Sequence, residues 1–188
     1  MTADRNDRIP SGRFRELGPL NWVMAKLAAR RMGVPEMHLF TTLGQRQVLF
    51  WTWSMYSGRL LRGRLPAIDT ELVILRVAHV RGCEYELQHH RGMASKQGLD
   101  ADMQAAIFAW PALGEGAADR LSERQRALLA ATDEFVKDRT VTDATWRRLA
   151  THLDRRQLIE FCLLASQYDG LAATMSALAI PLDKPPTG

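Results

Sequence analysis

Residues 65–92 read LPAIDTELVILRVAHVRGCEYELQHHRG, an apolar helical pattern, a break at Gly82 and a second helical pattern rich in ionisable groups. In a helix, Glu71 shares a stripe with Ile74 and Leu75. Folding would bury its carboxylate there, and a buried carboxylate is costly unless a function requires it. The pattern therefore predicts an acidic group held inside a helical core.

Three reactive side chains follow on one stripe of the second helical pattern. Cys83, Glu86 and His90 are spaced i, i+3 and i+7, which puts them on one face. Each has an ordinary explanation by itself. An exposed acid–imidazole pair contributes only roughly 0.2–0.5 kcal/mol, a lone cysteine is usually a small buried hydrophobe, and Glu71 could be an acid favoured by a helix N-terminus. All of these explanations must hold together for a site to be absent, so the pattern favours a catalytic cluster.

Other side chains near this cluster are candidates for substrate contacts. Cys83 begins its helix, where unpaired backbone N–H groups and the helix dipole favour a thiolate. Tyr85 and His89 lie on the adjacent stripe, either lining the same pocket or bordering it. Tyr168 lies in a polar step, 167–169, of an otherwise apolar helix, and we expect it to donate a hydrogen bond into a central cavity.

The composition is that of an ordinary globular protein. The 188 residues are 46% hydrophobic and 24% charged, with a formal net charge of +4, and this length allows a sizeable core. The arginines are scattered among acids, and the short cluster at Arg59, Arg62 and Arg64 carries no nucleic-acid-binding signature. We expect no nucleic-acid partner, whereas a small anionic substrate fits the mild positive charge.

The two cysteines do not indicate a disulfide scaffold. Cys162 stands between two apolar residues and is expected to be inert core. The start of the chain is polar and is followed by no apolar signal segment. No apolar run approaches the roughly 20 residues that span a bilayer. We therefore expect a cytoplasmic protein without a membrane partner.

Helical periodicity covers almost the whole chain, and no pair of strands with hairpin chemistry is found. Capping residues and Gly or Pro breaks delimit the expected helices. These are 21–31, 36–61 with an interruption near Gly44, 66–80, 83–97, 100–110, 122–137, one from 142 or 143, and 154–178.

The chain is expected to form one integrated domain in three parts. These are an N-terminal helical extension over 1–64, a core hairpin over 65–116 and a C-terminal helical half over 117–188, with the linker Gly114-Glu115-Gly116. Paired helix starts recur at nearly equal offsets: Leu65-Pro66 with Leu121-Ser122, and Leu99-Asp100 with Leu153-Asp154. The prediction is an all-α helical bundle around an antiparallel helical hairpin, with an internal duplication.

A metal site is not expected. Glu86 and His89 at i, i+3 would need a matching pair on another helix, and none of His38, His79 and His152 supplies one. The sequence also lacks a glycine-rich phosphate loop, a nucleophile elbow and a dinucleotide fingerprint. We therefore expect no metal and no cofactor.

The stretch from Leu65 to about Leu99 resembles the carboxymuconolactone decarboxylase and alkylhydroperoxidase D-like superfamily. The resemblance rests on short motifs: Leu65-Pro66, the run that begins at Glu71, Cys83-x-Tyr85-Glu86 with His90, and Gly98-Leu99. It implies an all-helical fold built around this hairpin. It also implies a homo-oligomer, such as a trimer or hexamer.

The chain departs from the peroxidase branch of this superfamily at a decisive position. That branch carries a glutamate, a C-x-x-C pair and a histidine, matching Glu71, Cys83 and His90, but the second cysteine falls on Glu86. Without it, the internal dithiol–disulfide cycle cannot run. The decarboxylase branch is more similar, because it has glutamate at this position within a Glu-Leu-x-x-His stretch and needs no cysteine.

The leading hypothesis is a cofactor-free acid–base enzyme, a lyase acting by decarboxylation or proton transfer on a small lactone or carboxylic acid. Burial beside Ile74 and Leu75 would raise the basicity of Glu71. His90, oriented by Glu86, would be its partner acid or base.

The remaining candidates have supporting roles in this hypothesis. Cys83 would be a spectator or an auxiliary proton donor. Tyr85, His89 and Tyr168 would contact the substrate. An arginine, Arg76 or Arg91, would hold a substrate carboxylate.

Two alternatives stay open. A one-cysteine peroxidase with peroxiredoxin-type activity would use Cys83 as the peroxidatic thiolate, Glu71 and His90 as a proton relay, and an external thiol as reductant. The other alternative is a non-catalytic helical oligomer whose site has decayed. Both enzymatic hypotheses require Glu71 and His90 to meet in one enclosed space.

Overall fold

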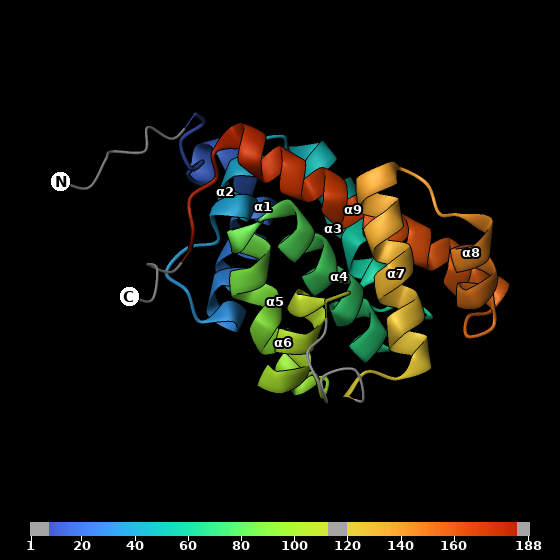
Figure 1. Ribbon diagram of the computed structural model, residues 1–188. Coiled ribbons are helices and arrows are strands. Elements are labelled where there is room, and N and C mark those ends of the chain that lie inside the picture. Colours follow the sequence, from blue (N-terminus) through green and yellow to red (C-terminus); the bar gives the residue numbers. More distant parts are fainter. Residues whose placement is uncertain (1–7, 113–119, 184–188) are drawn as a thin grey trace. The chain divides into compact units, whose positions relative to one another are not determined.

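The computed structural model describes residues 8–112 and 120–183, and every regular element in these residues is a helix (Figure 1). This confirms the all-α prediction. The predicted linker at 114–116 lies outside the described residues. The helices are α1 (Phe14–Met32), α2 (His38–Leu43), α3 (Gln47–Leu60), α4 (Ala67–Arg81), α5 (Glu84–Lys96), α6 (Ala101–Ala109), α7 (Glu123–Asp138), α8 (Asp143–Ala150) and α9 (Arg155–Leu178).

The chain folds as two compact units. Of the described residues, one unit contains 8–58 together with 173–183, and the other contains 59–112 and 120–172. The three-part division and the internal duplication expected from the sequence stay predictions.

The first unit contains α1, α2 and most of α3. Its α1 begins at Phe14, earlier than predicted, because a short helical segment precedes the predicted helix. Gly18 has a positive φ of 70° and kinks α1 between these two segments, just before Pro19. Proline is well suited to restart a helix, because the N–H it lacks would have no helical partner there. Asp183 accepts hydrogen bonds from the backbone N–H and the ring Nδ1 of His38, at 2.8 and 2.7 Å. These contacts hold the start of α2 to the residues that follow α9.

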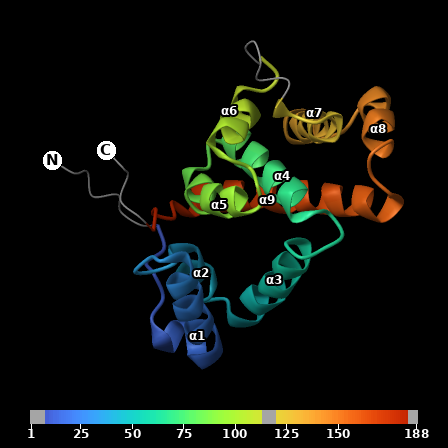
Figure 2. The ribbon, with the colours of Figure 1, turned by 90° about the horizontal axis from the view of Figure 1, so that it is seen from below.

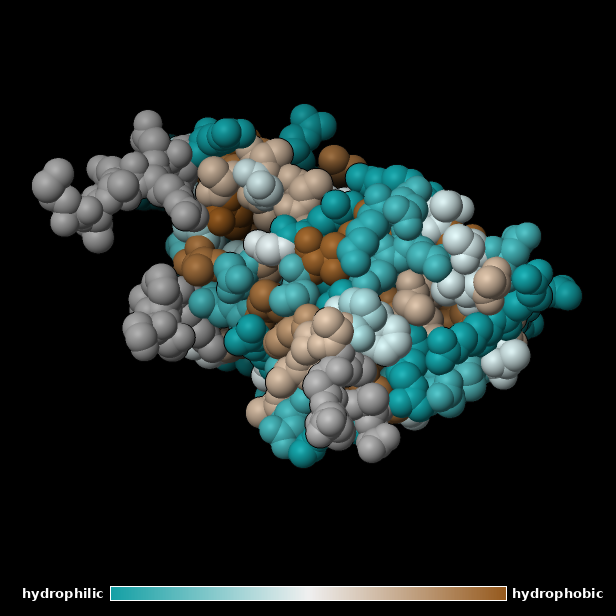
Figure 3. All heavy atoms as spheres, in the orientation of Figure 1, coloured by the Kyte–Doolittle hydropathy of each residue, from teal (hydrophilic) through white to brown (hydrophobic). Residues whose placement is uncertain are grey.

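The second unit is built around α4. In Figures 1 and 2, α5 and α6 lie on one side of α4 and α7 lies on the other, and α4 packs against all three. All residues of α4 from Asp69 to Ala78 are buried, which explains why its sequence is apolar almost all round. By contrast, hydrophilic side chains cover the outer face of α7 (Figure 3).

The helix boundaries in the second unit follow local capping chemistry. The Ser122 hydroxyl accepts from the backbone N–H of Gln125 at 3.2 Å, and the Gln125 side chain accepts from the N–H of Ser122 at 2.9 Å, which completes a capping box. Asp100 accepts from the N–H of Met103 at 2.8 Å. The predicted helix starts at 100 and 122 are therefore confirmed to within a residue. None of the described helices combines the length and apolarity needed to cross a bilayer.

Candidate active site

A two-residue turn brings the reactive residues of α4 and α5 together. Gly82 ends α4 in the left-handed conformation (φ 60°), and its N–H donates to the carbonyl of His79 at 3.1 Å. The N–H of Cys83 donates to the carbonyl of Ala78 at 2.8 Å. Glycine adopts this conformation at little cost. The turn sends α5 back along α4, as the predicted hairpin requires.

Glu71 and His90 are in direct contact across this hairpin. The distance from His90 Nδ1 to Glu71 Oε2 is 2.9 Å, and the two residues are only 8% and 4% exposed. In a buried site, a charge-assisted hydrogen bond is stronger than on a surface. With its proton on Nδ1, the imidazole donates to the carboxylate and keeps a lone pair on Nε2. The pair can therefore accept a proton from a bound molecule.

Glu86 is a buried carboxyl group one turn before His90. The residue is 3% exposed, and neither carboxyl oxygen has a hydrogen-bond partner among the described residues that meets ordinary geometry. Burial raises the pKa of Glu86 to about 8, and the nearby Asp169 carboxylate adds to this rise. The interaction with the Cys83 thiol, a weak donor, acts in the opposite direction. At neutral pH, Glu86 is therefore mainly a neutral acid that can donate a proton.

The expectation of a stabilised thiolate at Cys83 is wrong in direction. Cys83 is the N-cap of α5, and the backbone N–H groups of Glu86 and Tyr85 do favour the thiolate. However, burial and the negative charge of Glu86 outweigh them and raise the Cys83 pKa to about 12. Cys162 also differs from expectation, because it is only half-buried, and its partial burial raises its pKa.

The aromatic candidates surround the histidines of α5. The ring of Tyr168 meets the ring of His90 edge-to-face, with centroids 5.3 Å apart. Burial raises the pKa of Tyr168 well above its ordinary value, and the carboxylates of Glu86 and Glu71 add to this. On the adjacent stripe, the rings of Tyr85 and His89 lie 5.0 Å apart, and both residues are buried. The structure thus brings Tyr168 to the cluster, whereas roles for Tyr85 and His89 in binding stay predictions.

An ion cluster beside Glu86 was not identified from the sequence. Asp169 accepts from the Arg81 guanidinium and from Arg139 at 2.9 Å, and Arg81 also donates to the carbonyl of Val136 at 2.6 Å. The polar step that contains Tyr168 pointed to this part of α9, but nothing in the sequence singled out the two arginines.

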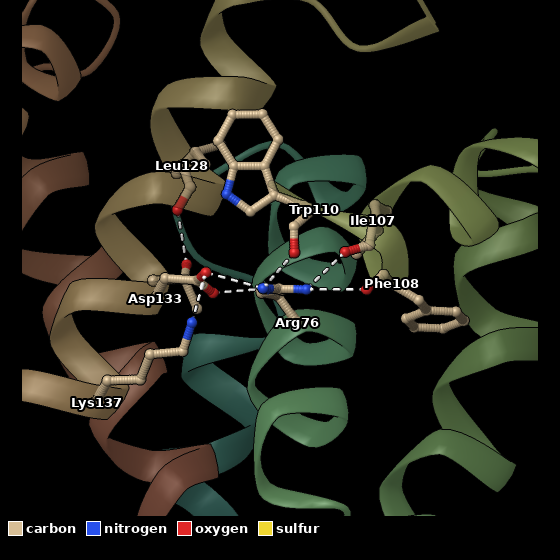
Figure 4. A network of polar contacts seen from close by, with 8 residues as sticks. Arg76, Ile107, Phe108, Trp110, Leu128, Asp133 and Lys137 are labelled. Carbon is tan, nitrogen blue, oxygen red and sulfur yellow. Dashed lines mark hydrogen bonds and ion pairs between the residues drawn. The ribbon is translucent and has the colours of Figure 1, made fainter. Parts of the chain in front are cut away.

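Arg76, one candidate for binding a substrate carboxylate, already binds one. Its guanidinium donates to both oxygens of Asp133, at 2.6 and 2.8 Å, and to three carbonyls at the end of α6 (Figure 4). Burial acts to raise the pKa of Asp133, but Arg76 and Lys137 hold it below its ordinary value. The other candidate, Arg91, places its guanidinium 5.1 Å from the centre of the Phe108 ring. Arg76 therefore joins α4, α6 and α7.

A cavity of about 300 Å³ lies elsewhere, in the first unit. It is lined by aromatic and basic side chains, among them Phe14, Trp22, Arg13 and Lys26, and by none of the residues predicted for the site. Its lining also includes Glu36, which accepts a hydrogen bond from Thr41 at 2.6 Å, but none of its described lining residues is a histidine or cysteine, so the cluster around His90 is the better candidate for acid–base chemistry. In the part of the chain that the structure describes, no three His, Cys, Asp or Glu side chains converge as ligands for a metal ion.

Several solved structures share this fold. An uncharacterised peroxidase-related protein with an alkylhydroperoxidase AhpD core, from Ralstonia eutropha JMP134, superposes with a TM-score of 0.79 at 15% identity, over 94% of this chain and 92% of its own. A peroxidase-related protein from Silicibacter sp. TM1040 gives 0.74 at 13% identity, over 92% and 91%. A cysteine-to-alanine variant of the debrominase Bmp8, in complex with 2,3,4-tribromopyrrole, gives 0.73 at 15% identity, over 92% and 90%.

The sequence comparisons agree with the family inferred from the motifs. No curated protein matches the chain by sequence. The profile of the carboxymuconolactone decarboxylase family matches residues 47–134, which include α4, α5 and the Glu71–His90 pair. Residues 47–134 thus match the carboxymuconolactone decarboxylase family, and the fold is similar to that of alkylhydroperoxidase D-like proteins.

Proposed function

We propose that the protein is a cofactor-free acid–base enzyme that transfers protons on a small carbonyl compound or lactone. The observation that carries this proposal is the 2.9 Å contact between His90 and Glu71 in the core, next to a buried carboxyl group, Glu86. At neutral pH, proton transfer on a carbonyl compound needs a base and a neutral acid that lie in different environments.

The proposed step is enolisation of the substrate. Nε2 of His90 takes a proton from the carbon next to the carbonyl group, and the C–H electron pair becomes the new carbon–carbon double bond. The carbonyl oxygen takes a proton from Glu86, and the reverse transfers return both protons. Glu71 stabilises the imidazolium that forms on His90. Decarboxylation would share the second transfer, with carbon dioxide leaving in place of the proton.

Exchange of substrate protons with heavy water tests this function. NMR would follow the protons next to the carbonyl of a simple lactone incubated with the protein. We expect Glu71→Gln and His90→Gln to lower the exchange rate severely, because they remove the group that orients the base and the base itself. Cys83→Ser should leave the rate unchanged. Full exchange by Glu71→Gln, or none by the wild type, would argue against the proposal.

A peroxidase that uses only Cys83 is the second candidate. The similar folds named peroxidase-related favour it, whereas the raised pKa of Cys83 weighs against it. In that reaction the thiolate attacks the O–O bond, an alcohol or water leaves, and an external thiol reduces the sulfenic acid. Thiol-dependent consumption of peroxide, lost in Cys83→Ala and kept in Cys162→Ala, would support this candidate.

The assembly state belongs to the proposal as well. We expect a homo-oligomer, as the superfamily resemblance implies, and sedimentation analysis of the purified protein would test it. An oligomer without proton exchange and without peroxide consumption would favour a non-catalytic role.

A further inference from the structure

The groups that surround His90 are acidic. Glu71, Glu86 and Tyr168 are 4%, 3% and 6% exposed, and each carries an acidic group. A further anion in this interior would lose its hydration and meet negative charge. An uncharged molecule would bear neither cost.

Two arginines linked to this acidic cluster through Asp169 already bind a carboxylate. Arg81 and Arg139 both donate to Asp169, and the Asp169 charge acts on Glu86. Arg81 also donates a hydrogen bond to the carbonyl of Val136. Both arginines are exposed, whereas the Asp169 side chain is buried, so a substrate carboxylate would have to displace Asp169 to reach them from the interior.

Arg76, which is also on α4, is bound as firmly. Arg76 donates to Asp133 through two nitrogens and to the carbonyls of Ile107, Phe108 and Trp110 (Figure 4). It is 3% exposed. Removing Arg76 from these acceptors would leave several buried groups unpaired, so it is held in a structural role.

The Glu86 carboxyl group can form further hydrogen bonds. Both of its oxygens are buried, and neither has a partner of ordinary hydrogen-bond geometry among the described residues. A neutral carboxyl group has one O–H to donate, and a carbonyl oxygen is a suitable acceptor. We propose that the substrate bound beside Glu86 is an uncharged lactone, ester or ketone whose carbonyl oxygen accepts from this group, and that free carboxylates are disfavoured.

This inference rests on the proposed proton-transfer function and narrows it. An uncharged substrate has no carboxylate to lose as carbon dioxide, so the reaction becomes enolisation or isomerisation. Asp169 acquires a role in specificity, because it neutralises the two arginines that would otherwise attract an anion.

Methyl paraconate and paraconate are suitable probes, because they share one lactone ring and differ by one charge. Binding to the intact protein would be measured by saturation-transfer NMR, and proton exchange would be followed in heavy water. We expect the wild type to bind the ester at least roughly tenfold more tightly than the carboxylate at pH 7, since like charges brought together cost affinity.

A matched pair of variants tests the role of the ion cluster. Asp169→Asn releases Arg81 and Arg139 and should reduce the preference for the ester. Glu123→Gln also removes a carboxylate that binds two arginines, but on the surface, where Glu123 pairs with Arg126 and Arg148. It should leave the preference unchanged. Circular dichroism would show whether both variants fold. If one does not, the binding of methyl paraconate and paraconate to the wild type still tests the inference.

The outcomes separate this inference from the proposed function. Paraconate binding as tightly as the ester, or binding of neither, would overturn the inference. Exchange of paraconate that is lost in Glu71→Gln would meanwhile uphold the acid–base function. Preferential binding of the ester without any exchange would uphold the charge preference and contradict the function.

Discussion

Nδ1 of His90 lies 2.9 Å from Oε2 of Glu71, although 19 residues separate them in the chain. The contact is set by the left-handed turn at Gly82 and by the position of His90 on the inner face of α5. On a surface such a pair would contribute little. In the core, burying the pair is costly unless each group is satisfied, so its presence indicates a requirement beyond packing.

Glu71→Gln should remove most of the activity and little of the fold. Glutamine preserves the size of the side chain but cannot stabilise an imidazolium by charge, so we expect kcat/KM for lactone proton exchange to fall roughly 10²- to 10⁴-fold. NMR exchange rates in heavy water would measure this change.

The exposed Glu84 on α5 supplies the control for that measurement. Glu84→Gln removes the same charge from the same hairpin and should retain the wild-type rate. Equal losses in both variants would mean that the effect is general electrostatics and that Glu71 has no specific role.

Glu86 should make the protein less stable as pH rises. Its pKa is about 8 in the folded protein against 4.5 for an unperturbed glutamate, so between these values the folded state binds more protons than the unfolded state. The contribution of Glu86 to the free energy of unfolding is therefore largest below about pH 4.5, falls between pH 4.5 and pH 8, and is constant above pH 8. Urea unfolding at pH 6 and pH 9 should show a decline of about 2 kcal/mol that Glu86→Gln removes.

The same pair of pH values provides a check on this assignment. Glu84→Gln should keep the wild-type decline, because Glu84 is exposed. An unchanged decline in Glu86→Gln would instead place the titrating group elsewhere.

Much of the fold could be predicted because its determinants are local. The capping box at Ser122 and Gln125, and the glycine that ends α4, act over a few residues, so sequence spacing alone indicates them. The Glu71–His90 contact was also predictable, because a short connection between two helices leaves few ways to arrange their inner faces.

The properties that were not predictable depend on distant residues. The partner of Arg76 is Asp133, 57 positions away, and Asp169 lies 88 positions from Arg81. The prediction of a stabilised thiolate at Cys83 was wrong for a related reason. The favourable backbone N–H groups are local, but burial is a property of the whole fold, and burial has the larger effect on the pKa.

Cys83 should react slowly with alkylating agents. A pKa of about 12 leaves very little thiolate at pH 7.5, so in a Cys162→Ala background we expect alkylation by iodoacetamide at least roughly a hundredfold slower than that of free cysteine. The rate should keep rising with pH up to 10. Mass spectrometry of the modified protein would measure it, with Cys83→Ala as the blank. Fast alkylation that reaches a plateau below pH 8 would reveal a thiolate and favour the peroxidase.

Arg76→Lys should destabilise the protein strongly although it preserves the charge. Lysine cannot reproduce the two parallel hydrogen bonds to Asp133 while also reaching the carbonyls of Ile107, Phe108 and Trp110, so buried acceptors lose their donors. We expect a loss of about 2–3 kcal/mol in the free energy of unfolding, measured by urea denaturation.

Arg148→Lys is the matched control, because Arg148 pairs with the exposed Glu123 at 2.8 Å, and surface pairs contribute little. We expect no measurable change in its unfolding midpoint. If Arg76→Lys also left the free energy of unfolding unchanged, the hydrogen bonds of Arg76 to Asp133 and to the carbonyls would not be needed for stability. Arg76 would then be available to bind a ligand. In that case Arg76→Lys should weaken paraconate binding, which would also contradict the charge preference inferred for the site.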